Sequence, residues 1–267
     1  MKSACVLLAL TVATAFANPL PVGEAIFGGS PAAPGQFPYF AHLTFGFENG
    51  QSNVCFGSLL TDRHLLTAGH CCQGVFKEGK AVLGFDDLAK LDAPSVQNGK
   101  IVKCVVNPGF GPNGASGFFN DIAVVELESP VSFTDSVQPV KVPNRDFFLS
   151  LEAPVPKASV IGFDGNSSQL QFARVQFANH FSCEIQYKPH ELTINEKMIC
   201  LARPEKGVSK GDDGAPNVIT WKRQVYQMGV NSFFAADLPS VSTRTSQYCD
   251  FLQSSTGKAF KCSEFKP

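Results

Sequence analysis

The sequence LLTAGHC at residues 65–71 decides the fold, and three other short segments extend the pattern along the chain. These are IFGG at residues 26–29, NDIAVV at 120–125 and GDDGAP at 211–216. Taken alone, His70 would more often be an ordinary polar side chain, and Asp121 a turn or cap residue. The order and spacing of the four segments give these two residues their significance.

Short apolar runs, separated by Gly, Pro, Asn and Asp, fill the chain around these segments. The runs are residues 39–45, 81–83, 101–106, 122–127, 158–163, 198–201 and 224–230. They are rich in Val, Ile and Phe and shorter than a typical helix, so they predict β-strands packed as barrels or sandwiches. Near the carboxyl end, Tyr248, Phe251 and Leu252 fall at i, i+3 and i+4, which predicts a helix with one apolar stripe.

The composition is that of a globular protein. Hydrophobic side chains make up 44% of the 267 residues and charged ones 17%, which excludes a disordered chain. The formal charge of −1, from 22 basic and 23 acidic residues, supplies no general attraction to nucleic acid or to an anionic membrane. We therefore expect no nucleic-acid partner and no membrane partner. We also expect a monomer that needs no cofactor and binds an extracellular protein partner.

The amino terminus has the pattern of a secretory signal. Lys2 precedes an apolar run over residues 4–16, and the triplet AFA at 15–17 is typical of signal peptidase sites. A membrane anchor is the alternative, but a span needs roughly 20 apolar residues. The sequence predicts a signal peptide at 1–17, a short pro-segment at 18–25 and a secreted, extracellular product.

The cysteines agree with export. Removal of Cys5 with the signal leaves eight, an even number suited to disulfides in an oxidising compartment. A zinc site is the weaker interpretation, because no Cys-x-x-Cys pair occurs. Asn166 begins a glycosylation sequon after the turn signal at 164–165, where we expect a surface loop.

Three of the four segments resemble the trypsin/chymotrypsin-like serine protease family (peptidase S1). IFGG, followed by GQFPY at 35–39, is similar to the amino terminus of a mature member; LLTAGHC and NDIAVV are similar to the segments that hold the catalytic histidine and aspartate. The resemblance covers residues 26 to about 255. It implies an all-β fold of two six-stranded antiparallel Greek-key barrels with a C-terminal helix, in a domain at 26–267. It places His70 and Asp121 at the positions of the general base and its orienting carboxylate.

The fourth segment departs from the family pattern. Where the family has Gly-Asp-Ser-Gly-Gly-Pro, this chain has GDDGAP, so Asp213 occupies the place of the nucleophilic serine. A carboxylate is a poor nucleophile toward an amide, and it offers a base no hydroxyl proton to remove. Its charge also lies beside the backbone N–H groups of Gly211 and Asp213, the oxyanion-hole positions. We expect an inactive homologue.

His70 is expected to lie between Asp121 and Asp213. Nearby negative charges raise a histidine pKa, so the sequence predicts a persistent imidazolium. A metal bound by these three side chains is the alternative, since carboxylates and imidazole are both ligands. We expect no metal.

Activation and the specificity pocket also differ from the family. In the family, a new amino group at the position of Ile26 pairs with the aspartate matched by Asp212. Here the preceding residue is Ala25, and residues 18–25 contain no Lys or Arg for a trypsin-like activator. The sequence is compatible with two alternatives: cleavage after Ala25 by another enzyme, or a loop that stays permanently zymogen-like.

In the pocket, Gly207 stands where trypsin-like members have an aspartate, so no preference for Arg or Lys is implied. Ser232 resembles the serine of the substrate-binding strand. Phe234 replaces a glycine at the pocket mouth and is expected to obstruct it, unless a loop shift moves it aside. Ser209 takes the place of a pocket cysteine, so the bridge that braces the pocket is missing.

The resemblance also implies the disulfides. Cys55–Cys71 and Cys183–Cys200 match two that the family commonly has. Cys72–Cys104 corresponds to an extra bridge beside the histidine segment in some invertebrate members, and Cys249–Cys262 closes the tail.

The leading hypothesis is a secreted, non-catalytic serine protease homologue that acts by protein binding or regulation in extracellular defence or proteolytic cascades. An active serine-type endopeptidase with an atypical site is the first alternative. A secreted store or structural protein that retains only the fold is the second.

Overall fold

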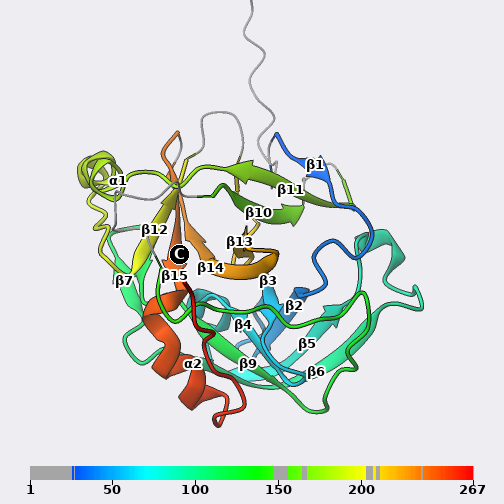
Figure 1. Ribbon diagram of the computed structural model, residues 1–267. Coiled ribbons are helices and arrows are strands. Elements are labelled where there is room, and N and C mark those ends of the chain that lie inside the picture. The colour runs from blue at the N-terminus through cyan, green and yellow to red at the C-terminus, as the bar shows by residue number, and fades with distance from the viewer. Residues whose placement is uncertain are drawn as a thin grey trace, which may run out of the picture.

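The computed structural model describes residues 26, 28–146, 156–163, 167–202, 207–208, 211–235 and 237–266. Two β-structures lie side by side, one above the other in Figure 1, and helix α2 packs beside them at the lower left. The predicted signal peptide (1–17), pro-segment (18–25), Asn166 and Ser209 lie outside the described residues and stay predictions.

The first β-structure is a closed six-stranded barrel with the strand order β2-β3-β4-β9-β6-β5. Its strands are β2 (Phe40–Phe47), β3 (Ser52–Leu59), β4 (His64–Thr67), β5 (Phe76–Leu83), β6 (Gln97–Val106) and β9 (Ala123–Leu127). Side chains of β2 alternate between buried and half-buried, as expected when one face of a strand fills a barrel. Every strand pair of the barrel is antiparallel.

The second β-structure is a seven-stranded sheet with the order β1-β11-β10-β13-β14-β15-β12. Its strands are β1 (Ser30–Pro31), β10 (Ala158–Phe163), β11 (Leu170–Val175), β12 (Met198–Leu201), β13 (Pro216–Trp221), β14 (Gln224–Phe233) and β15 (Ser240–Arg244). An antiparallel bridge from Phe177 to Leu201 joins the end of β11 to β12 and brings β10–β15 into a ring. The predicted pair of six-stranded barrels is therefore confirmed, with β1 added at an edge.

The helices are short. The predicted C-terminal helix is α2 (Cys249–Ser255), preceded by a 3-10 turn at Thr245–Tyr248, and Tyr248 and Leu252 are buried as its apolar stripe requires. Helix α1 (His180–Tyr187) was not predicted, because its apolar residues alternate along the sequence, and two of them, Phe181 and Ile185, are exposed. Further 3-10 turns are Gly69–Cys72, Leu88–Lys90 and Lys188–His190. Strands β7 (Gly111–Asn113) and β8 (Gly117–Phe119) form a separate hairpin.

All four implied disulfides are present: Cys55–Cys71, Cys72–Cys104, Cys183–Cys200 and Cys249–Cys262. The first two tie the Gly69–Cys72 turn to β3 and β6, on either side of the segment that carries His70. Among the helices of the described residues, none has both the length and the apolar character that a membrane span needs.

Candidate active site

The Gly69–Cys72 turn positions His70 directly after strand β4. Gly69 is closely packed: a Cβ there would lie 3.0 Å from the Phe110 ring and 3.2 Å from the Ile122 nitrogen. The two residues after His70 are both bound in disulfides. Close packing and covalent bonds together fix the direction of the imidazole.

Asp121 lies between β8 and β9 and its side chain is fully buried. Its Oδ1 accepts a hydrogen bond of 2.8 Å from the His70 backbone N–H, and its Oδ2 lies 2.7 Å from His70 Nδ1. The Ser232 hydroxyl donates to the same Oδ2 at 2.5 Å. Thr243 Oγ1 donates to the Asp121 carbonyl at 2.7 Å. A buried carboxylate with these donors orients the imidazole, as an acid–base dyad requires.

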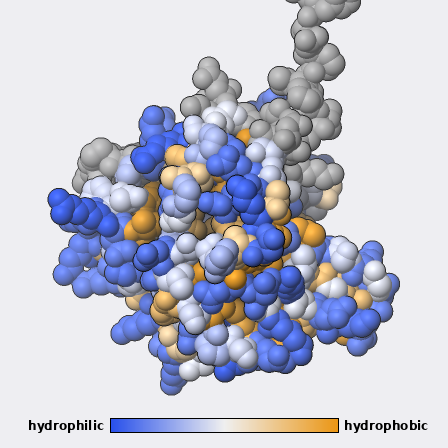
Figure 2. All heavy atoms as spheres, turned by 90° about the vertical axis from the view of Figure 1, so that its right-hand side faces the viewer, coloured by the Kyte–Doolittle hydropathy of each residue, from blue (hydrophilic) through white to orange (hydrophobic). Residues whose placement is uncertain are grey.

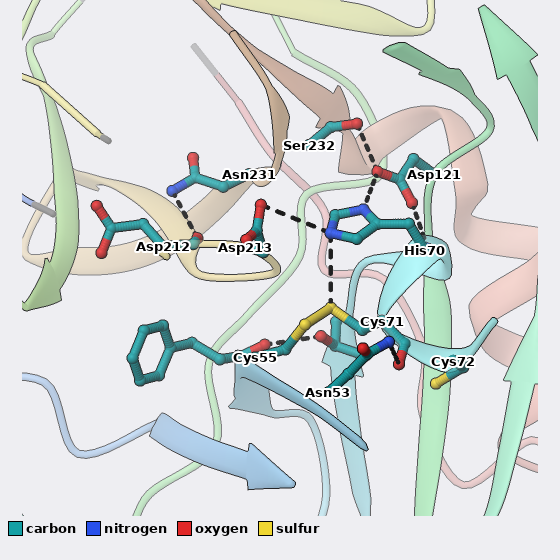
Figure 3. Close-up of a disulfide and its surroundings, with 12 residues drawn as sticks. Asn53, Cys55, His70, Cys71, Cys72, Asp121, Asp212, Asp213, Asn231 and Ser232 are labelled. Carbon is teal, nitrogen blue, oxygen red and sulfur yellow. Dashed lines mark hydrogen bonds and ion pairs between the residues drawn. A yellow bond between two sulfur atoms is a disulfide. The ribbon is translucent and has the colours of Figure 1, made fainter. Parts of the chain in front are cut away.

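Asp213 faces the other ring nitrogen of His70. Its Oδ1 lies 3.6 Å from His70 Nε2, and Figure 3 shows the imidazole between the two carboxylates. The Asp213 side chain is 43% exposed, against 16% for His70, so this ion pair opens toward solvent. The structure thus brings together the three residues that the sequence singled out.

The charge of His70 follows from this environment. Burial opposes the protonated form, but the hydrogen bond to Asp121 and the negative charges of Asp121 and Asp213 outweigh it and raise the pKa of His70 to about 10. The imidazole is therefore an imidazolium at neutral pH. A protonated imidazole has no free lone pair with which to accept a proton, which is the task of a general base.

The turn that carries Asp213 is anchored by Asn231 of β14. Asn231 donates from its backbone N–H to the Ala215 carbonyl at 2.9 Å and accepts from the Gly214 N–H at 3.0 Å. Its side-chain amide donates to the Asp212 carbonyl at 3.2 Å. Sequence reasoning missed Asn231, because its role depends on contacts between segments that are distant along the chain.

The oxyanion-hole positions are Gly211 and Asp213. Gly211 has a φ of +104°, a conformation that favours glycine. Within the described residues, neither the Gly211 amide nor the Asp213 amide donates to a protein acceptor. The Asp213 carboxylate is attached to the same turn, and its negative charge disfavours a second anion beside these amides.

Asp212 and Ile26 both pack against Gly162. A Cβ on Gly162 would come within 1.8 Å of Asp212 Oδ1 and 3.1 Å of Ile26 Cγ1, so only glycine fits between them. Both side chains are buried, and the Ile26 nitrogen donates to the Phe163 carbonyl at 2.8 Å. Asp212 points away from His70 (Figure 3). The two predicted pairing residues are therefore neighbours, with the Ile26 nitrogen hydrogen-bonded to the backbone.

Phe234 lines a narrow cavity together with Val208, Asp213 and Ser232. The cavity volume is about 10 Å³, room for about one water molecule. Gly207, directly before Val208, is buried. The described lining of this cavity leaves no space for a large side chain. The predicted obstruction by Phe234 stays a prediction, because residues 203–206, 209–210 and 236 lie outside the described residues.

Phe118 of β8 covers one face of His70, a contact that no sequence pattern signalled. The two rings are stacked, with centroids 5.1 Å apart and an interplanar angle of 17°. Phe110 stacks in turn on Phe118 at 5.5 Å. An aromatic face against an imidazolium adds a cation–π attraction. The β7–β8 hairpin therefore stabilises the charged ring.

The sulfurs of Cys55 and Cys71 also lie near His70, since the nitrogen and sulfur atoms of the three residues are within 4.8 Å of one another. The two cysteines form a disulfide and offer no thiolate to a metal. This group is therefore structural.

Comparison with known protein families agrees with this geometry. Residues 26–252 match the Trypsin family model. The chain belongs to the trypsin family.

Trypsin-family relatives match the chain over most of its length. It is 30% identical over 234 residues to chymotrypsin of Phaedon cochleariae, covering 85% of this chain and 81% of the relative. It is 27% identical over 255 residues to phenoloxidase-activating factor 3 of Holotrichia diomphalia, covering 85% and 71%. It is 27% identical over 259 residues to CLIP domain-containing serine protease B9 of Anopheles gambiae, covering 87% of this chain but only 63% of that protein.

Trypsin-family catalysis needs a hydroxyl nucleophile beside a neutral imidazole. In this chain His70 and Asp121 have the geometry of the histidine–aspartate pair, while a carboxylate stands where the hydroxyl belongs. The arrangement is chemically an ion pair flanked by a buried carboxylate.

Proposed function

We propose that this trypsin-family chain is a secreted, non-catalytic homologue that acts by binding another extracellular protein. The observation that carries the proposal is the ion pair between Asp213 and His70, at 3.6 Å, in place of a hydroxyl beside a neutral base. A serine nucleophile is activated when a neutral imidazole removes its hydroxyl proton. Here the hydroxyl is missing, and the imidazole is already protonated.

Two further features support the loss of catalysis. The cavity lined by Phe234 is too small for a substrate side chain. Phe118 covers one face of the imidazole. Substrate positioning contributes a large part of enzymatic rate enhancement, so both features would lower turnover even if the nucleophile were restored.

An extracellular setting is supported by the cysteines. All eight cysteines after the predicted signal are paired in disulfides, which persist in oxidising compartments. One relative is named a phenoloxidase-activating factor, and we propose an activation cascade of that kind as the setting for this chain.

The second candidate function is that of an endopeptidase with an atypical site, favoured by the intact His70–Asp121 geometry. The full chain, and a form cut before Ile26, should be incubated with a broad peptide library and a serine-reactive fluorophosphonate probe. We expect neither turnover nor labelling. Turnover by the unaltered chain that disappears in His70→Ala would overturn the proposal.

Restoring the nucleophile tests the pocket separately. Asp213→Ser alone should give little activity, because the cavity that Phe234 lines has a volume of only about 10 Å³. The double variant Asp213→Ser/Phe234→Gly should be the more active of the two, on the order of tenfold or more in kcat/KM toward a large apolar side chain. Asp213→Ser/His70→Ala is the matched control and should be inactive. Strong proteolysis by Asp213→Ser alone would show that the pocket is open.

A further inference from the structure

A groove on a different face of the molecule shares no lining residue with the His70 site. It lies between the turn at residues 33–38, the ends of the β5–β6 connection, and the loop at Asp135–Ser136, and its volume is about 380 Å³. The turn at 33–38 connects β1 to β2, and residues 84–86 follow β5; both lie on the right-hand side of Figure 1. Figure 2 faces this side and shows hydrophobic atoms set back among hydrophilic ones. A volume of this size is typical of ligand sites.

The walls of the groove are held by the backbone. The carbonyl of Asp86 accepts a hydrogen bond from the Leu170 amide at 2.8 Å, and the Leu170 carbonyl accepts one from the Ala32 amide at 2.8 Å. Gly84 packs so tightly on the Ser95 carbonyl that a Cβ would approach it to 2.1 Å. The groove is therefore formed before any partner binds, which lowers the entropic cost of binding.

The groove is acidic. Among the described residues that line it, Asp86 and Asp135 are the charged ones, and none is Lys, Arg or His. Within the described part of the chain, neither carboxylate takes part in an ion pair or a side-chain hydrogen bond. By contrast, the neighbouring Asp87 pairs with Lys90 at 3.2 Å. Neither carboxylate is neutralised by a cation among the described residues. The groove therefore complements a positively charged group of a partner.

Aromatic rings form the apolar part of the same groove. Phe37 is half-buried and packs edge-on against Phe172, with centroids 5.4 Å apart. Phe85 lines the groove and stacks on Phe163 at 6.1 Å, nearly parallel. A planar guanidinium lies well on aromatic and apolar surfaces and donates to carboxylates with a fixed fork of N–H groups.

We infer that this groove binds an arginine-containing segment of a partner protein. The guanidinium would pair with Asp86 and Asp135, and the aliphatic part of the side chain would contact Phe37 and Phe85. The inference builds on the proposed binding function by supplying its surface. It does not depend on Asp213, so either proposal can fail without the other.

Fluorescence anisotropy with a fluorescein-labelled GSRGRSG peptide tests the inference on the full chain at low salt. We expect saturable binding, weakened on the order of tenfold by Asp86→Asn/Asp135→Asn and by a peptide with citrulline in place of both arginines. Asp92→Asn is the matched control, an exposed acidic residue of the same connection outside the groove. It should bind like the unaltered chain, as should Asp213→Ser.

Thermal unfolding of each variant verifies that it is folded. Absence of saturable binding, equal affinity for the citrulline peptide, or unchanged affinity in the folded double variant would each overturn the inference. Mass spectrometry of the recovered peptide separates the two proposals: cleavage by the unaltered chain would contradict the non-catalytic function and leave the groove unaffected.

Discussion

The imidazole of His70 should remain protonated until the pH approaches 10, and Asp213→Asn should lower its pKa toward the ordinary histidine value near 6.5. Removing the Asp213 charge takes away the opposite charge that lies 3.6 Å from His70 Nε2. Burial lowers the pKa of His70, and in this variant only Asp121 would remain to raise it. An NMR titration of the imidazole carbons measures both values, and His70→Gln identifies the resonance by its absence.

The same pKa gives a pH dependence of stability. Because the folded-state pKa of His70, about 10, lies above the unfolded value of 6.5, the folded chain holds the proton more tightly. The resulting stabilisation is fully present below pH 6.5 and is lost as the pH rises toward 10. At ~1.4 kcal/mol for each pH unit between the two values, the free energy of unfolding should fall by on the order of 4–5 kcal/mol.

Urea denaturation at pH 6.5, 8 and 10 measures this loss. The pH dependence should become smaller in Asp213→Asn and smaller still in His70→Gln, which lacks the titrating group. A His70 that titrates at or below 6.5 in the unaltered chain would contradict the ion pair and would restore a neutral base to the site.

Loss of the buried ion pair between Arg244 and Asp146 should destabilise the fold by about 3–5 kcal/mol. Both side chains are buried, with exposed fractions of 6% and 1%. Arg244 Nε donates to Asp146 Oδ2 at 2.8 Å, its Nη1 donates to the Glu196 carbonyl at 2.9 Å, and Ser246 also donates to Asp146. Asp146→Ala would leave the guanidinium buried without its carboxylate, the costly half of such a pair.

Urea denaturation of Asp146→Ala and of Asp146→Leu/Arg244→Met distinguishes the cause. The double variant should recover most of the loss, since an apolar pair leaves no buried charge. Lys100→Ala/Glu128→Ala is the control, because that pair has a similar short contact of 2.7 Å but exposed fractions of 64% and 54%. It should stay within about 1 kcal/mol of the unaltered chain. A loss this small in Asp146→Ala would show that the buried pair is not needed.

Most of the fold and part of the site could be predicted from local sequence. The apolar runs that predicted strands, such as 158–163 and 198–201, became β10 and β12, because short runs rich in β-branched residues are a local signal. His70, Asp121 and Asp213 each lie in a short segment with a recognisable pattern, and the structure brings them together.

The remaining features depend on contacts between distant segments. Phe118 reaches His70, 48 positions earlier in the chain, only because the β7–β8 hairpin folds over the Gly69–Cys72 turn. The groove combines residues near 35, 85, 135 and 170, which share no motif. In helix α1 the apolar residues alternate along the sequence, at positions 181, 183, 185 and 187, so the pattern has the period of a strand and not the i, i+3, i+4 spacing that identified α2.

The adjacent cysteines after His70 have a consequence for how the site should be interpreted. Cys71 is bonded toward β3 and Cys72 toward β6, so two covalent bonds leave successive residues for different strands of one barrel. With a single disulfide the turn could rotate about that bond, whereas two disulfides to different strands fix its orientation. The backbone that presents His70 is thus held by the covalent frame, while Asp121 orients the ring.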